Sequence, residues 1–265
     1  MSIASELTVL EGYIEDAYDA VSARGGTLPA NKNMSNLGAA ISSISGGGGV
    51  NYGLPRTQST DGTTLTAANA GYTYTTPSGI TTIAARALQY AFYGDANISH
   101  ADLSAVTTLS GLDCLYHAFD SSTLASVDLS ALTNVGSAGG LRYAFQNCAN
   151  LATITVGSQS GFNATSNAFA YGCSGCTSLT AATINMKSMF QQACRGAFEN
   201  CTSLTSVSFP VLTSINSTHK NNVMSGMLTG CSDVAVHFPA AMQATVSTIS
   251  DLTFGGTNTT VLFDL

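Results

Sequence analysis

The stretch AFENCTSLTSVSFP at residues 197–210 recurs, with variations, along most of the chain. Related copies carry a Phe anchor at Phe92, Phe119, Phe145, Phe169 and Phe198, and a degenerate copy places Leu228 there. Successive Phe anchors are 27, 26, 24 and 29 residues apart, and Leu228 follows after a further 30. A period of this length indicates a solenoid, in which each repeat packs on its neighbours. Because a solenoid presents a long surface rather than a deep cleft, we expect it to bind something large.

The composition excludes several classes of partner. Charged residues make up 9% of the 265 residues, far below the roughly 25% of an ordinary soluble protein. The net charge is −7 and the eight Lys and Arg residues are scattered, so we expect no nucleic-acid partner. No apolar run approaches the roughly 20 residues of a membrane span, so we expect no membrane insertion. The N-terminus lacks the basic start and apolar core of a secretory signal, which favours export inside a particle.

Cysteines recur at one position of the repeat. Cys148, Cys201 and Cys231 each follow the anchor by three residues, and Cys176 precedes a Leu at the same distance as Cys148 and Cys201 do. Such residues should form a column inside the solenoid, and a thiol is small enough to be buried readily. We therefore predict that most of the seven cysteines are reduced core residues.

The first 44 residues have a different pattern. Residues 2–22 show the apolar spacing of a helix with an a/d seam, and a second helix is predicted from about residue 34 to residue 44. The two helices form either a hairpin folded on itself or an oligomerising coiled coil. Residues 45–53 are rich in Gly and predict a flexible linker, because the Gly-Lys-Ser/Thr of a phosphate loop is missing.

Residues 54–265 form the predicted repeat domain. We expect an N-terminal cap of short strands at 54–89, repeats from about 80 to about 240, and a C-terminal cap at 241–265 with a strand at Thr259–Leu265. The repeat containing Phe169 has about four extra residues, which predict a loop at Tyr171–Gly175. Strands should follow the anchors, at Ser126–Leu129, Leu151–Val156, Leu204–Phe209 and Val234–Phe238.

The pattern Ala-Phe-x-Asn-Cys-x-x-Leu-x-x-Val/Ile-x-Phe-Pro, clearest at residues 197–210, resembles the BspA-like leucine-rich repeats of bacterial and phage surface proteins. The resemblance covers roughly residues 80–240. It implies an α+β chain, with a short helical hairpin or coiled coil followed by a leucine-rich-repeat solenoid that carries a parallel β-sheet. Residues 17–37 look like a module of structural proteins from phages and prophages of gut Gram-positive bacteria.

This combination implies a protein of the phage virion surface, made in the bacterial cytoplasm. Residues 1–44 would contact other virion structural proteins, and the repeats would recognise a host-cell surface glycan or protein. Analogy with phage fibres favours a homo-oligomer, with a trimer preferred. The alternatives are a capsid decoration or head-fibre protein without a receptor, a glycan-cleaving tail enzyme, and a bacterial surface adhesin.

Candidate chemistry is sparse, and we expect a protein that is not an enzyme and has no cofactor. The chain lacks the Gly-x-Ser-x-Gly and His-Glu-x-x-His motifs. Asp102 and Asp128 hold one repeat position, so they could lie on neighbouring coils about 5 Å apart, as a catalytic pair or as turn caps. Cys173 and Cys176 form a Cys-x-x-Cys without a second ligand pair for zinc, which favours packing or a local disulfide over a metal site.

A row of aromatic residues is the remaining candidate for binding. Tyr90, His117 and Tyr143 precede the Ala-Phe anchor at one repeat position and should form a partly buried stripe. If exposed, such a stripe could stack on sugars or contact a protein. No individual binding residue is assigned, and we expect function to reside in the Ser, Thr and Asn positions of the strands and in the loop at Tyr171–Gly175.

Overall fold

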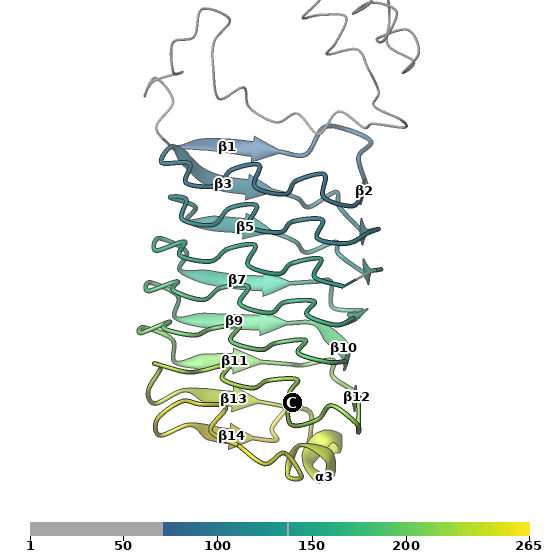
Figure 1. Ribbon diagram of the computed structural model, residues 1–265, viewed down its shortest axis with the longest axis vertical. Coiled ribbons are helices and arrows are strands. Elements are labelled where there is room, and N and C mark those ends of the chain that lie inside the picture. Colours follow the sequence, from purple (N-terminus) through teal and green to yellow (C-terminus); the bar gives the residue numbers. More distant parts are fainter. Residues whose placement is uncertain (1–70, 137) are drawn as a thin grey trace, which may run out of the picture. The chain divides into compact units, whose positions relative to one another are not determined.

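The computed structural model describes residues 71–136 and 138–265, and it confirms a solenoid of parallel strands (Figure 1). By its contacts the chain divides into two units, Met1–Asn51 and Tyr52–Leu265. The predicted helical hairpin of residues 1–44, the linker of residues 45–53 and the first part of the predicted cap lie outside the described residues. All of the described residues belong to the second unit, the repeat domain.

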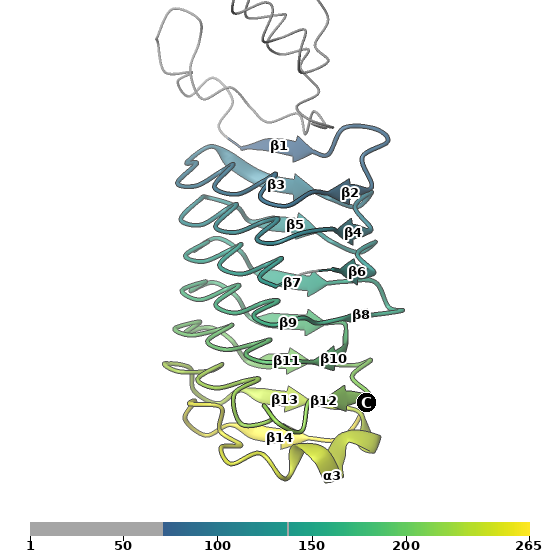
Figure 2. The ribbon, with the colours of Figure 1, turned by 45° about the vertical axis from the view of Figure 1, so that its right-hand side comes forward.

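The coils of the solenoid up to residue 215 contribute strands to two faces, and the last two strands lie on the first face (Figure 2). The first face consists of β1 (Tyr72–Thr75), β3 (Ile98–Asp102), β5 (Ser126–Asp128), β7 (Thr153–Val156), β9 (Ala181–Ile184), β11 (Ser206–Ser208), β13 (Ala235–His237) and β14 (Thr260–Leu262). The second consists of β2 (Thr82–Ile83), β4 (Thr108–Leu109), β6 (Asn134–Val135), β8 (Phe162–Asn163), β10 (Met186–Met189) and β12 (Ser214–Ile215). A short 3-10 helix η1 (Ala240–Met242) and the helix α3 (Gln243–Val246) come after β13.

The two faces replace the single sheet expected from the repeats. On the first face the hydrogen-bonded orders are β1-β3-β5 and β14-β13-β11-β9-β7, and on the second they are β2-β4-β6 and β12-β10-β8. Both faces are divided at one level, between the coil of β5 and β6 and the coil of β7 and β8. The strands on the first face lie where we predicted them but are shorter, since the apolar residues that flank them turn the corners of the coil.

The first coil begins earlier than predicted. β1 pairs with β3 in parallel, and β2 pairs with β4 in the same way. The segment expected to be a cap therefore supplies, from residue 71, a coil like the later ones. At the other end β14 pairs with β13 in parallel register, Val236 with Val261, so the predicted final strand is also part of the stack (Figure 1).

The third side of each coil, which we call the turn face, comprises residues 86–94, 113–121, 139–147, 167–175 and 192–200. Its backbone N–H groups alternate between two partners: Tyr90 N donates to Tyr116 O of the next coil at 3.0 Å, and Ala91 N donates to Leu88 O at 3.1 Å. Every fourth residue has a positive φ, between 50° and 77°. Because this pattern repeats in register, side chains at equivalent positions form rows along the solenoid.

Rows of stacked side chains make up the core. The rings of Phe92 and Phe119 are parallel with centroids 4.9 Å apart, and Phe145 continues the row at 5.7 Å from Phe119. All three are buried. Burial of such side chains stabilises the fold by about 1.5–3 kcal/mol each, since roughly 25 cal/mol is gained for each Å² of apolar surface removed from water.

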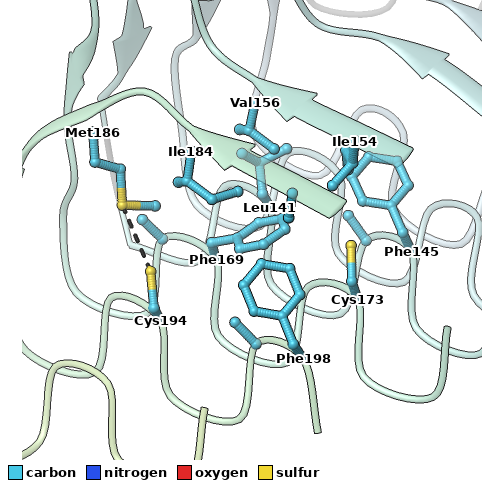
Figure 3. Packing of buried hydrophobic residues seen from close by; sticks show 14 of the residues in the cluster. Leu141, Phe145, Ile154, Val156, Phe169, Cys173, Ile184, Met186, Cys194 and Phe198 are labelled. Carbon is cyan, nitrogen blue, oxygen red and sulfur yellow. Dashed lines mark hydrogen bonds between the residues drawn. The ribbon is translucent and has the colours of Figure 1, made fainter. Parts of the chain in front are cut away.

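The anchor of the fourth copy is not Phe169, and the loop predicted at Tyr171–Gly175 is absent. Phe145 N donates to Gly172 O at 2.8 Å, and Cys173 N donates to Ala197 O at 2.8 Å, so Cys173 occupies the position of Phe145 and Phe198 (Figure 3). Phe169 lies four residues earlier, in the row of Leu88, Leu115 and Leu141. The large ring of Phe169 fills the volume that the small side chain of Cys173 leaves. An alignment based on the Phe residues therefore places the anchor of this copy four residues too early.

The cysteine column is confirmed. All seven cysteines are free and buried. Four occupy equivalent positions, and each thiol donates to a carbonyl of the preceding coil, as Cys148 does to Phe119 O at 3.0 Å and Cys176 to Phe145 O at 3.0 Å. Burial raises the pKa of Cys148, and the neighbouring Cys176 adds to the effect. These thiols are neutral core donors.

Candidate functional site: an aromatic ladder on the turn face

Aromatic rings stack along the turn face in a continuous row, which we call the aromatic ladder. Its members are Tyr90, His117, Tyr143 and Tyr171. Ring centroids lie 5.2, 4.6 and 5.1 Å apart in that order, and successive rings are within 5° of parallel. The prediction of a stripe at Tyr90, His117 and Tyr143 corresponds to the first three members. Tyr171 was missed because the anchor after it is Cys173 rather than Phe.

The backbone of the turn face sets the ladder's spacing. Each member has a positive φ, from 50° at His117 to 56° at Tyr90 and Tyr143, and belongs to the every-fourth-residue pattern. The next coil has Gly196 at the equivalent position, and a Cβ built there would meet Cε1 of Tyr171 at less than van der Waals distance. The ladder therefore ends on Gly196, which leaves room for the last ring.

Aromatic residues at these positions carry both a cost and a gain in stability. A positive φ costs a residue other than Gly about 1–2 kcal/mol. A stacked aromatic pair is worth about 0.5–1.5 kcal/mol beyond the area it buries. The apolar area that the half-buried rings remove from water adds to this gain. Stacking and burial thus offset the strain of the ladder's backbone.

The ladder is open to solvent along part of its surface. Tyr90 is 49% exposed, and the adjoining Tyr93 is 56% exposed. His117, Tyr143 and Tyr171 are half-buried. The partial burial that we expected is therefore confirmed for His117 and Tyr143, whereas Tyr90 is exposed. Because neighbouring rings cover the faces of His117 and Tyr143, a ligand reaches these two through ring edges and polar atoms.

Further rings and an arginine widen the ladder into a patch. Tyr116 packs edge-on against Tyr90, at 5.5 Å, and against Tyr143, at 5.8 Å. The guanidinium of Arg142 lies over the ring of Tyr116, with Cζ 4.7 Å from the centroid. Its Nη2 donates to Asp113 Oδ1 at 3.4 Å, and its buried Nε has no hydrogen-bond partner among the described residues. Tyr and Arg are the residues enriched where proteins bind partners tightly.

Burial keeps the phenol of Tyr143 neutral. It raises the pKa of Tyr143, and Tyr171 adds to this, while Arg142 acts in the opposite direction. The Tyr143 hydroxyl therefore offers both a donor and an acceptor at neutral pH. Nδ1 of His117 lies 2.6 Å from Asp120 Oδ2, which fixes the orientation of the imidazole within the stack.

The structure places Asp102 and Asp128 side by side but at turns. The two residues are direct partners in the register of β3 and β5, as their common repeat position predicted. Asp102 Oδ1 accepts hydrogen bonds from Ser104 Oγ at 2.6 Å and Ser104 N at 3.0 Å, and Asp128 Oδ1 accepts one from Ser130 N at 2.8 Å. These bonds lower the pKa of Asp102. A general acid needs a raised pKa, so the geometry supports turn-capping carboxylates.

Cys173 and Cys176 are both fully buried free thiols in adjacent core rows. Among residues 71–136 and 138–265, no group of three His, Cys, Asp or Glu side chains is arranged to hold a metal ion. Burial raises the pKa of Cys173 well above its usual value. The packing interpretation of this Cys-x-x-Cys is the one that the structure supports.

In the part of the chain that the structure describes, no helix is long and apolar enough to cross a membrane. A comparison with family models found the BspA type leucine-rich repeat region (6 copies), matched at residues 85–224 and 116–260. These matches span the turn face and both strand faces. No significant match to a curated protein or to a solved structure was found.

Proposed function

The chain belongs to the BspA-type leucine-rich repeat family, and we propose that it is a non-catalytic attachment protein of the phage virion surface. It binds a glycan or a protein of the host-cell surface. The observation that carries the proposal is the aromatic ladder, a row of partly exposed rings on a rigid stack. Tyr90 and the adjoining Tyr93 are exposed, so a partner can reach the rings at this end of the ladder.

The setting on a phage particle is supported by the sequence. Residues 17–37 resemble a module of phage and prophage structural proteins, and the low content of charged residues suits a protein exposed outside the cell. In this proposal residues 1–44 bind other virion proteins and assemble a homo-oligomer, with a trimer favoured. Several copies of the ladder on one particle would raise the avidity for a surface well above the affinity of one site.

A bacterial surface adhesin is the second candidate. The family match covers the repeats, and the pattern of these repeats resembles that of bacterial as well as phage surface proteins. The ladder would serve such a protein equally well. A capsid decoration without a receptor is the third, and it leaves the exposed aromatic patch unexplained. Immunogold microscopy distinguishes the candidates, since it places the chain on the tail, on the head or on the bacterial wall.

The test of attachment uses the full chain and candidate host cells. We expect the purified protein to bind cells, and the double variant Tyr90→Gly/Tyr93→Ser to lose at least tenfold in apparent affinity. Both residues are exposed, and the positive φ of Tyr90 suits Gly, so the variant should fold. Leu252→Ser is the matched control, because Leu252 is 38% exposed outside the ladder. Equal binding by both variants would exclude the ladder as the attachment surface.

A further inference from the structure

The corners between the two strand faces are irregular at one place. The chain passes from the first face to the second in seven residues between Val156 and Asn163. The equivalent points of the next coil are Ile184 and Ser188, and there the passage takes four residues. The corner after that, Phe209 to Ser214, takes five. A long corner thus adjoins a short one, and the short one is set back between its neighbours.

This setback forms a groove of about 470 Å³, which we call the corner groove. Its lining comes from the three corners and the strands that lead into them: Thr155, Gln159, Thr183, Asn185, Pro210 and Val211. Pockets for small molecules typically measure about 300–1,000 Å³. The groove is therefore large enough for one or two sugar rings and too small for a folded protein.

The polar groups of the groove are uncharged and include both donors and acceptors. Thr155 and Thr183 are direct partners in the register of β7 and β9 and supply hydroxyls, and Gln159 supplies an exposed amide. Asn185 is only 3% exposed. Its Nδ2 donates to Gly157 O at 2.8 Å, and its Oδ1 accepts no hydrogen bond from the residues that the structure describes. The Asn185 amide is thus held in place, and its Oδ1 can accept a hydrogen bond from a ligand.

We propose that the corner groove binds a neutral saccharide. Sugar hydroxyls need donors and acceptors together, which paired Thr hydroxyls and amides provide, while Pro210 and Val211 offer apolar surface to the ring's C–H groups. An anionic or cationic ligand would find no ionisable side chain in the lining. This site is separate from the aromatic ladder. It rests on the proposed attachment function for its biological role but not for its chemistry.

The absence of an aromatic ring from the groove's lining sets the expected affinity. Hydrogen bonds exchanged with water contribute little net free energy each. One groove should therefore bind with a dissociation constant of about 1 mM. Binding to a cell surface would depend on several copies acting together.

The experiment titrates the isotope-labelled full chain with lactose, maltose and N,N′-diacetylchitobiose and follows its amide NMR signals. We expect at least one disaccharide to shift signals of Thr155, Gln159, Thr183 and Asn185. The double variant Thr155→Val/Thr183→Val, which keeps the β-branched shape, should weaken binding at least tenfold. Thr153→Val, an exposed position on the same strand outside the groove, is the matched control.

The proposal is overturned if none of the three sugars shifts these signals, if the double variant binds as well as the control, or if glucose 6-phosphate binds more tightly than glucose. Cell binding is measured in parallel. Sugar binding by a protein that binds no cells would overturn the attachment function and leave the groove in place. Cell binding that persists without any sugar response would do the reverse.

Discussion

At the scale of single residues, the fourth repeat exchanges volume between two neighbouring core positions. In the first three coils one row is Leu (Leu88, Leu115, Leu141) and the row four residues later is Phe, but in the fourth Phe169 and Cys173 take these places. A Cβ added to Gly172 would meet the ring of Phe169 at less than van der Waals distance, whereas the equivalent residues of other coils, Ala91, Ala118 and Ala144, carry that Cβ. Gly172 is therefore required by Phe169 and not by the backbone.

This exchange predicts a coupled pair of substitutions. Gly172→Ala alone should lower the free energy of unfolding by about 1–3 kcal/mol through overpacking. In the background of Phe169→Leu, which restores the residue of the other coils, the same change should cost much less. Urea unfolding of the two single variants and the double variant measures the coupling free energy. Additive effects would show that Phe169 and Gly172 do not share this space.

The ladder positions predict an unusual order of substitutions. At His117, where φ is 50°, Gly should leave the protein about 1 kcal/mol more stable than Ala does, because Ala keeps the steric cost of this conformation. At the adjoining Ala118, whose φ is not positive, Gly should be less stable than Ala by about 0.5–1 kcal/mol. Thermal unfolding of the three variants tests the contrast. The same order at both positions would contradict the left-handed backbone of the ladder.

At the scale of elements, the apolar repeat predicts strands where apolar and polar residues alternate over several positions. Ile154 and Val156 alternate with exposed Thr in β7, so that strand could be placed from the sequence. The strands of the second face could not be placed in this way, because strands such as β8 have only two residues, too few to show an alternation of apolar and polar side chains. The ladder's first members were visible as a repeated Tyr or His. Tyr171 could not be recognised in this way, because the anchor that follows it is Cys173 rather than a Phe.

The corner groove could not be predicted for a related reason. It depends on the difference between two adjacent corners, and the sequence shows only that the spacing of the anchors varies. The sequence predicts this variation as a loop at Tyr171–Gly175, whereas the structure places it at Gly157–Gly161 and Asn185. Length differences in a solenoid can be located only when the register between coils is known, because any surface turn can accommodate them.

The long corner predicts a deletion that separates folding from binding. Removing Gln159 and Ser160 gives that corner the five-residue step found from Phe209 to Ser214. Stability should change by less than about 1 kcal/mol, because loop length has a weak effect on the free energy of folding. Sugar binding in the NMR titration should disappear, since Gln159 lines the groove. Retained binding would place the saccharide elsewhere, and the control Thr153→Val should change neither property.

At the scale of the whole molecule, rows of uncharged, buried Phe and Cys side chains stabilise the solenoid in place of ion pairs. Described ion pairs are few, and that of Arg142 with Asp113 is 3.4 Å long. Salt should therefore have little effect on stability. Buried thiols are among the groups through which alkaline pH acts, because each must stay protonated in the folded state. Burial raises the pKa of Cys194 to about 12 and also raises the pKa values of Cys148, Cys173 and Cys201.

These thiols predict a loss of stability in alkali. In the unfolded chain a thiol ionises near pH 8.5, so its contribution is complete below that pH and is lost as pH rises toward the folded pKa, about 12 for Cys194. Each such thiol should lower the free energy of unfolding by up to about 1.4 kcal/mol per pH unit. We expect urea unfolding from about pH 7 to about pH 10.5 to show that the free energy of unfolding falls less steeply with pH for Cys194→Ala than for the wild type. Val236→Ala is the control, because it changes a buried residue without a titrating group, and its free energy of unfolding should depend on pH as that of the wild type does. The same pH dependence for Cys194→Ala would show that the Cys194 thiol does not carry the effect.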